Sequence, residues 1–385
     1  MAAHGFPQFS DGNVEIHFSS ADEKYVLHSH VLALHSSWFK ATLSERWNGG
    51  GENTMVNGKN RWVYELRFEK GSSEDTLVRE QSAEQTTNTE LYVGSNVAPS
   101  RGRSAEQALT DLERCYHVTT LKDMLRTLYH LPPTFNPRRP QSFSVRPDIV
   151  ALCDTAQYYG CDPVVRPYIE NHLAQNQTQF CEDCHKNPLS MLEFAIAVRA
   201  GWIFMEAVTH IIGWDEEEYE EAIEKLEELG VIGLLDRKRA EFIALLQTHE
   251  YRLLRLDPRK NERYRNHHSY MAVSCFRQWL NERISDGDGS GLEPSYASLY
   301  REIGNAPMED FKPSLQHHKR KANADVLNST LKAMRPDMKL ILKRAQDIVR
   351  PLLKNEARRQ DEGHDTRRPL TCMKIGEEEL PWVQK

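Results

Sequence analysis

The sequence has no long apolar run. No stretch approaches the roughly eighteen consecutive apolar residues that a membrane-spanning helix requires. The first residues, MAAHGFPQFSDG, contain neither a basic start nor an apolar core, so we expect no secretory signal. Seven cysteines are an odd count, and without an export signal they favour reduced thiols over disulfides. We therefore expect a cytoplasmic or nuclear protein without a membrane partner.

The sequence also lacks an excess of positive charge. Its net charge is −7, whereas proteins that bind phosphate backbones carry a local excess of Lys and Arg. The composition therefore disfavours nucleic acid as a partner. Hydrophobic residues make up 39% of the 385 residues, which suffices for a core and for two or three domains. No internal repeat is found, which argues against solenoids and propellers.

Alternating patterns near the N-terminus predict strands. Apolar and polar residues alternate over residues 14–18 and 24–28, and the polar residues between them predict a hairpin. Residues 61–69 alternate again, with the apolar residues Trp62, Tyr64, Leu66 and Phe68 on one face. Between these strands we expect one helix, capped by Ser29, with an apolar face made of Val31, Leu32, Leu34, Trp38, Phe39 and Leu43.

The rest of the chain reads as an insertion followed by helices. Residues 71–111 are mostly Ser, Thr, Glu, Gln, Gly and Arg, a composition typical of a disordered insertion. Apolar residues then recur at helical spacing. We expect helices over residues 121–131, 148–159, 164–175, 188–212, 234–256, 264–284 and 323–359. Residues 215–228 are dense in carboxylates, and we interpret them as a solvated helix face.

These patterns predict an α/β N-terminal domain, with a small mixed sheet and helices, followed by a mainly α-helical region. We place the first domain at residues 1–180, one helical region at 186–285 and a second at 286–360. Residues 361–385 are expected to be a frayed tail.

Three stretches carry a resemblance to a known family. After the second expected strand the chain reads HSHVLALHSSWF, from His28 to Phe39. Together with LRTLY, which ends at Tyr129, and the helix that ends at Tyr159, this stretch resembles a BTB/POZ domain of the divergent kind common in filamentous fungi. The matching positions are His28, Leu32, Ser36, Phe39, Leu125, Leu128, Tyr129, Leu152, Ala156 and Tyr159.

The chain departs from the family pattern in two ways. The family usually places an Asp directly before the first strand, whereas here Gly12 and Asn13 follow Asp11. The expected insertion also lengthens the middle of the domain. What the resemblance implies is a non-enzymatic module that binds proteins and often dimerises. Some relatives are adaptors for cullin-type ubiquitin ligases, and others regulate transcription. We expect Trp38, Phe39 and Leu43 to lie in the core or at an interface.

The His and Ser residues between positions 28 and 36 do not predict catalysis. A catalytic His–Ser pair needs an orienting group and an oxyanion site, and no G-x-S-x-G elbow occurs. We expect His28 to form a hydrogen bond within the fold. Ser36 should bond a carbonyl one turn back in the helix.

The segment Cys181-Glu-Asp-Cys184-His185 has three readings. C-x-x-C-H is the spacing for c-type haem, but haem attachment normally requires export. The same residues could hold zinc, although four ligands are needed and no second pair has that spacing. We favour two ordinary thiols in a linker, with no cofactor and no metal. As an alternative function, a minor zinc site here could serve a DNA- or chromatin-associated regulator, together with the basic residues 317–321 and the basic helix through Arg359.

Overall fold

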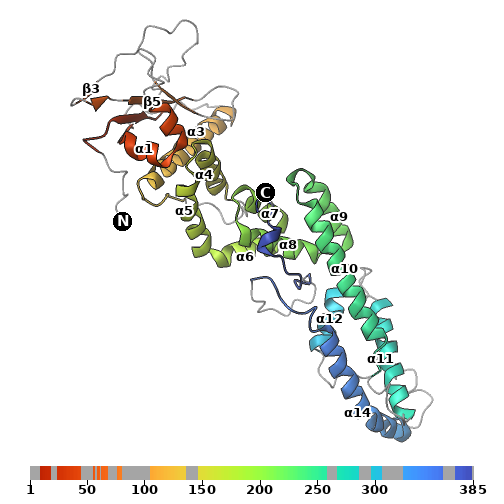
Figure 1. Ribbon diagram of the computed structural model, residues 1–385. Helices are drawn as coiled ribbons and strands as arrows, with labels where there is room; N and C mark the ends of the chain where they lie inside the picture. Colours follow the sequence, from red (N-terminus) through yellow and green to blue (C-terminus); the bar gives the residue numbers. More distant parts are fainter. Residues whose placement is uncertain are drawn as a thin grey trace. The chain divides into compact units, whose positions relative to one another are not determined.

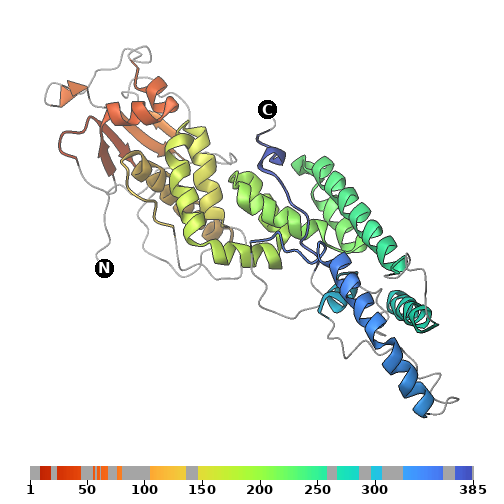
Figure 2. The same cartoon turned by 60° about the horizontal axis from the view of Figure 1, so that its bottom comes forward.

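A computed structural model describes residues 9–18, 24–44, 55–56, 59–60, 62–67, 76–79, 105–135, 146–257, 267–285, 296–305, 324–358 and 369–383 (Figures 1 and 2). The chain separates into two units, Met1–Asn176 and Gln177–Lys385, which we call unit 1 and unit 2. The division lies close to the boundary that we expected at residue 180. Each unit is described by itself.

A mixed four-stranded sheet forms the centre of unit 1, in the order β2-β1-β5-β6. Strand β1 (Val14–His17) is antiparallel to β2 (Lys24–Leu27) and parallel to β5 (Trp62–Arg67). Strand β6 (Thr76–Arg79) is antiparallel to β5. The predicted hairpin and third strand are therefore confirmed. The apolar residues of the alternating pattern are buried, as shown by Val14, Ile16, Trp62, Tyr64 and Leu66, and Glu15 on the other face of β1 is buried as well.

Helices cover the sheet and connect its parallel strands. The link from β2 to β5 contains α1 (Ser29–His35) and α2 (Ser37–Thr42), which are followed by the small ribbon of β3 (Met55–Val56) and β4 (Lys59–Asn60). A crossover of this kind is what a parallel pair requires. The later helices of unit 1 are α3 (Ala105–Leu128), α4 (Pro147–Tyr158) and α5 (Asp162–Gln175).

The structure corrects two predictions for unit 1. The single helix expected after residue 28 is broken at Ser36, and its N-cap is His28 rather than Ser29. The insertion expected over 71–111 contains β6, and its last residues, from Ala105, belong to α3. Residues 71–75 and 80–104 lie outside the described part of the chain.

Unit 2 contains only helices and connecting segments in its described part. The predicted fold class is therefore confirmed at the level of a mixed α/β region followed by a helical one. The helices are α6 (Gln177–Lys186), α7 (Pro188–Ala197), α8 (Gly201–Ile212), α9 (Glu216–Lys225), η2 (Glu227–Leu229), α10 (Ile232–Leu254), α11 (His267–Ser285), α12 (Tyr296–Asn305), α14 (Ala324–Val349) and η3 (Glu377–Glu379). None of the described helices combines the length and apolarity needed to span a bilayer.

Helix α8 is the most buried element of unit 2. Its sequence, GWIFMEAVTHII, is almost entirely apolar, and nine of its residues are buried. The continuous helix expected over 188–212 is instead two helices, because the chain turns at Arg199, whose φ of 51° is left-handed. Helices from both expected helical regions also pack together, since Ser269 of α11 donates a buried hydrogen bond of 2.8 Å to Asp337 of α14.

The tail expected over 361–385 is wrong for residues 369–383, which we call the strap. The strap packs against α8 and α10, and its Leu370, Ile375 and Leu380 are buried. The Leu370 carbonyl lies so close to Gly213 that a Cβ there would collide with it. Figure 2 shows the strap crossing unit 2 in dark blue. It covers apolar surface that the helices leave open.

Candidate functional site

His28 joins the end of β2 to the end of α3. Its backbone N–H donates to the hydroxyl of Tyr129 at 2.7 Å, and its Nδ1 lies 3.3 Å from the same oxygen. Its Nε2 lies 3.1 Å from Asp11 Oδ1. The ring of Phe9 completes the cluster by stacking on Tyr129 at 5.0 Å. His28 therefore forms hydrogen bonds within the fold, as predicted.

Ser36 ends one helix and begins the next. As the N-cap of α2, its hydroxyl accepts from Phe39 N–H at 3.1 Å and donates to the Tyr159 carbonyl at 2.6 Å. The predicted bond to a carbonyl one turn back is therefore wrong. Gly160, next to this carbonyl, has a φ of 62°, and a Cβ there would collide with Ser37 Oγ. Ser36 thus fastens α2 to the end of α4.

Aromatic rings fill the space behind α2. Phe39 is fully buried, stacks with Tyr159 at 6.0 Å and meets Tyr64 of β5 edge-on at 6.0 Å. Trp38 lies edge-on to Tyr159 at 5.1 Å and is half-buried. Leu32 is also fully buried. Leu32, Ser36 and Phe39 therefore belong to the core and cannot contact a partner without unfolding.

The apolar side chains of this region that reach solvent define a candidate surface. Leu34 is 76% exposed, although the sequence placed it on the apolar face of a helix. Trp38 and Leu43 are half-buried. We call these three residues the α1–α2 surface. The exposure of Leu34 was not predicted because the sequence pattern assumed one unbroken helix, whereas Ser36 has an extended backbone that separates α1 from α2. The surface can bind another apolar surface but contains no nucleophile.

The C-x-x-C-H segment lies on α6 and not in a linker, so that prediction is wrong. Cys181 and Cys184 are buried at 5% and 0% exposure. Burial raises the pKa of the Cys184 thiol, and the nearby Glu206 carboxylate raises it further. The Cys184 thiol is therefore a poor nucleophile. Among the described residues, no group of three or more His, Cys, Asp or Glu side chains is placed to hold a metal ion.

A buried ionisable pair on α8 was not predicted. Glu206 Oε1 and His210 Nε2 lie 3.6 Å apart, and both side chains are almost fully buried. Glu206 Oε2 accepts the backbone N–H of Arg358 at 2.8 Å, which ties the segment after α14 to α8. A glutamate four residues before a histidine in an otherwise apolar helix was the signal that could have revealed the pair. Its observed role is anchoring.

The basic cluster and the acidic segment noted in the sequence differ in whether the structure describes them. Residues 317–321 lie outside the described part of the chain. The acidic segment 215–228 forms α9 and η2, with Asp215 as the N-cap that accepts Glu218 N–H at 2.9 Å. Its carboxylates are exposed, as expected of a solvated face.

Comparison of the chain with protein-family models, with curated proteins and with solved structures yields no match. A function is therefore inferred from the residues and geometry of the chain itself.

Proposed function

We propose that the chain is a non-enzymatic protein-interaction protein whose unit 1 is a BTB/POZ-type docking module. The observation that carries the proposal is the meeting of the three resembling stretches. His28 contacts Tyr129, and Ser36 and Phe39 both contact Tyr159. These residues are more than a hundred positions apart in sequence, so a shared core explains why they occur together.

The order of elements also supports the proposal. A hairpin, a helical crossover, a strand parallel to the first, and then α3, α4 and α5 follow the order on which the resemblance depends. His28 and Ser36, two polar residues of the resembling stretch, fix element ends to one another. Binding through apolar side chains is the activity that this arrangement leaves open.

The partner that we propose is a second copy of the chain, bound through the α1–α2 surface. Stable interfaces bury roughly 1,600 Å² in total, and a few large anchors supply most of their affinity. Leu34 of α1 is the most exposed large apolar residue in the described chain, and half-buried Trp38 lies four residues later, in the first turn of α2. Through this module the chain would act as an adaptor, for which a cullin N-terminal domain is the partner implied by the resemblance.

Light scattering on the full chain and on a Leu34→Asp variant tests this proposal. At high ionic strength, we expect the wild-type chain to dimerise at tens of micromolar and the variant to have the mass of one 44.5 kDa chain. Tyr251→Asp is the matched control, since Tyr251 is 57% exposed in unit 2 and its replacement should leave the dimer intact. A wild-type chain that remains monomeric, or a dimer unaffected by Leu34→Asp, would contradict the proposal. Binding to a purified cullin N-terminal domain is measured separately.

A further inference from the structure

Helix α14 carries cations along one exposed side. Lys332, Arg335, Lys339 and Lys343 follow one another at intervals of three, four and four residues, so they lie on one face, and all four are exposed. We call them the basic stripe. The other side of α14 is buried and includes Met334, Met338, Ile341, Ala345 and Val349. The stripe therefore faces away from the core of unit 2.

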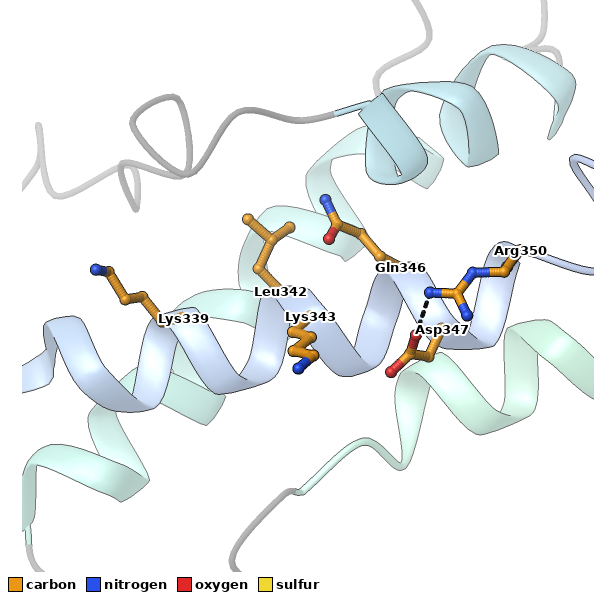
Figure 3. A pocket seen from close by; sticks show the side chains of 6 residues that line it. All are labelled: Lys339, Leu342, Lys343, Gln346, Asp347 and Arg350. Carbon is orange, nitrogen blue, oxygen red and sulfur yellow. Dashed lines mark hydrogen bonds and ion pairs between the residues drawn. The ribbon is translucent and has the colours of Figure 1, made fainter.

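The basic stripe carries uncompensated charge. None of its four residues forms an ion pair with any residue that the structure describes. Arg350 differs, because it is paired with Asp347 one turn before it. The stripe runs into a shallow depression of about 430 Å³, lined by Lys339, Leu342, Lys343, Gln346, Asp347 and Arg350 (Figure 3). Such a surface attracts an anionic partner.

Helix α9 and the turn after it carry carboxylates with the same spacing. Glu217, Glu220, Glu224 and Glu228 also follow one another at intervals of three, four and four residues, and all four are exposed. We call them the acidic stripe. They form no ion pair within the described part of the chain, whereas their neighbours Glu216 and Glu221 pair with Arg239 and Lys225. Aligned in parallel, the two stripes would pair Glu217, Glu220 and Glu224 of α9 with three cations of α14, and Glu228 of η2 follows in the same order.

The two stripes do not meet within one molecule. Helix α9 packs beside α8, whereas α14 packs against α10, α11 and α12. Figures 1 and 2 both show α14 extending away from α9 within unit 2. Each stripe therefore stays available to another molecule.

We propose that the basic stripe of one copy binds the acidic stripe of a second copy. The contact joins two different surfaces, so it leaves one stripe open on each molecule and can extend to further copies. It is separate from the α1–α2 surface and does not depend on it. Exposed ion pairs are individually weak and are screened by salt, so the association should be strongest at low ionic strength.

Charge exchange between full-length chains tests the proposal. One variant carries Glu217→Lys, Glu220→Lys and Glu224→Lys, and the other carries Lys332→Glu, Arg335→Glu and Lys339→Glu. Each variant alone has two stripes of the same sign, so its salt-sensitive self-association should weaken about tenfold, as loss of several exposed pairs implies. An equimolar mixture of the two variants should associate again, because each stripe then meets its opposite. Sedimentation at low and high ionic strength measures the effect.

The control is Arg344→Glu, an exposed cation on α14 outside the stripe, which should change little. Circular dichroism checks that each variant is folded. Failure of the mixture to associate would overturn the proposal, and so would wild-type association that is insensitive to salt. A different outcome would assign the basic stripe to nucleic acid. In that case the wild-type chain would bind duplex DNA, only the variant with three Lys and Arg replacements would lose this binding, and no charge-dependent self-association would be seen. A dimer formed through the α1–α2 surface would persist in every variant and at high salt, so the two associations are distinguishable.

Discussion

Units 1 and 2 close their cores by different means. Unit 1 joins the ends of its elements through hydrogen bonds between distant residues, such as Ser36 to the Tyr159 carbonyl. Unit 2 packs α6, α7, α9 and α10 against α8 and covers further surface of α8 with the strap. The strap has almost no regular secondary structure and is held by its buried side chains and by Glu379, which lies 3.0 Å from Lys238 Nζ. Unit 1 therefore depends on single well-placed groups, and unit 2 on one removable segment.

Deletion of residues 369–383 is the strongest test of this difference between the two units. Loss of Leu370, Ile375 and Leu380 would expose apolar surface on α8, and burial of each such side chain contributes about 1.5–3 kcal/mol. We expect unit 2 to lose about 5 kcal/mol of stability while unit 1 is unchanged. Hydrogen exchange of the amides of α8 and of β1 measures both units in one sample.

Val383→Ala is the control for the deletion, because Val383 is 55% exposed at the end of the strap and its truncation should have little effect. Unchanged protection of α8 after the deletion would mean that the strap does not hold unit 2 together.

Phe39→Ala should destabilise unit 1 and leave unit 2 unchanged, which is the opposite of the result expected for the deletion. It removes a fully buried ring between Tyr64 and Tyr159, and truncations of this kind cost about 3–5 kcal/mol. We expect exchange to rise in unit 1 and to stay constant in α8. Leu34→Ala, at an exposed position of the same region, should change stability by less than about 0.5 kcal/mol. An equal loss of protection in both units would show that they unfold together.

The smallest effect should come from pH, with the two units responding at opposite extremes. Burial would raise the pKa of Glu379, but hydrogen bonds from Gly376 N–H and Lys238 lower it below 4.5. Glu379 therefore stabilises the strap above pH 4.5, and this contribution is lost as the pH falls. Burial raises the pKa of Tyr129 from 10 to about 12. Its contribution to unit 1 is complete below pH 10 and is lost as the pH rises through 12.

Urea unfolding across pH checks this pair of effects. Glu379→Gln should flatten the acid side of the profile by less than about 1 kcal/mol, and Tyr129→Phe should flatten the alkaline side by less than about 3 kcal/mol. Glu377→Gln, exposed on the same turn as Glu379, should leave the profile as it is. Identical pH profiles of stability for Glu379→Gln and the wild type would show that Glu379 does not stabilise the strap.

Periodicity predicted most of the fold and failed where contacts are not periodic. The described apolar residues that alternate over 14–18, 24–28 and 61–69 lie on a buried face of each strand, so β1, β2 and β5 could be placed from sequence. The break at Ser36 depends on the Tyr159 carbonyl, which is 123 positions away. The strap has no repeating pattern, because its buried residues are spaced to suit the surface of α8 and α10.

The candidate site was predicted only in part. Hydrogen bonding of His28 within the fold could be expected from its place at a strand end. The exposure of Leu34 could not be predicted from sequence, because it depends on the separation of α1 from α2 at Ser36. Whether the α1–α2 surface binds a partner remains a prediction.

The strap also bears on how the chain is made. Thr209 of α8 contacts the carbonyl of Met373, a separation of 164 residues. Ribosomes add roughly 5–20 residues per second, so α8 leaves the exit tunnel many seconds before the segment that shields it. During that interval the apolar surface of α8 that the strap later covers is exposed to solvent in the nascent chain. Translation of the residues between α8 and the strap is therefore the period in which we expect the protein to depend most on a chaperone.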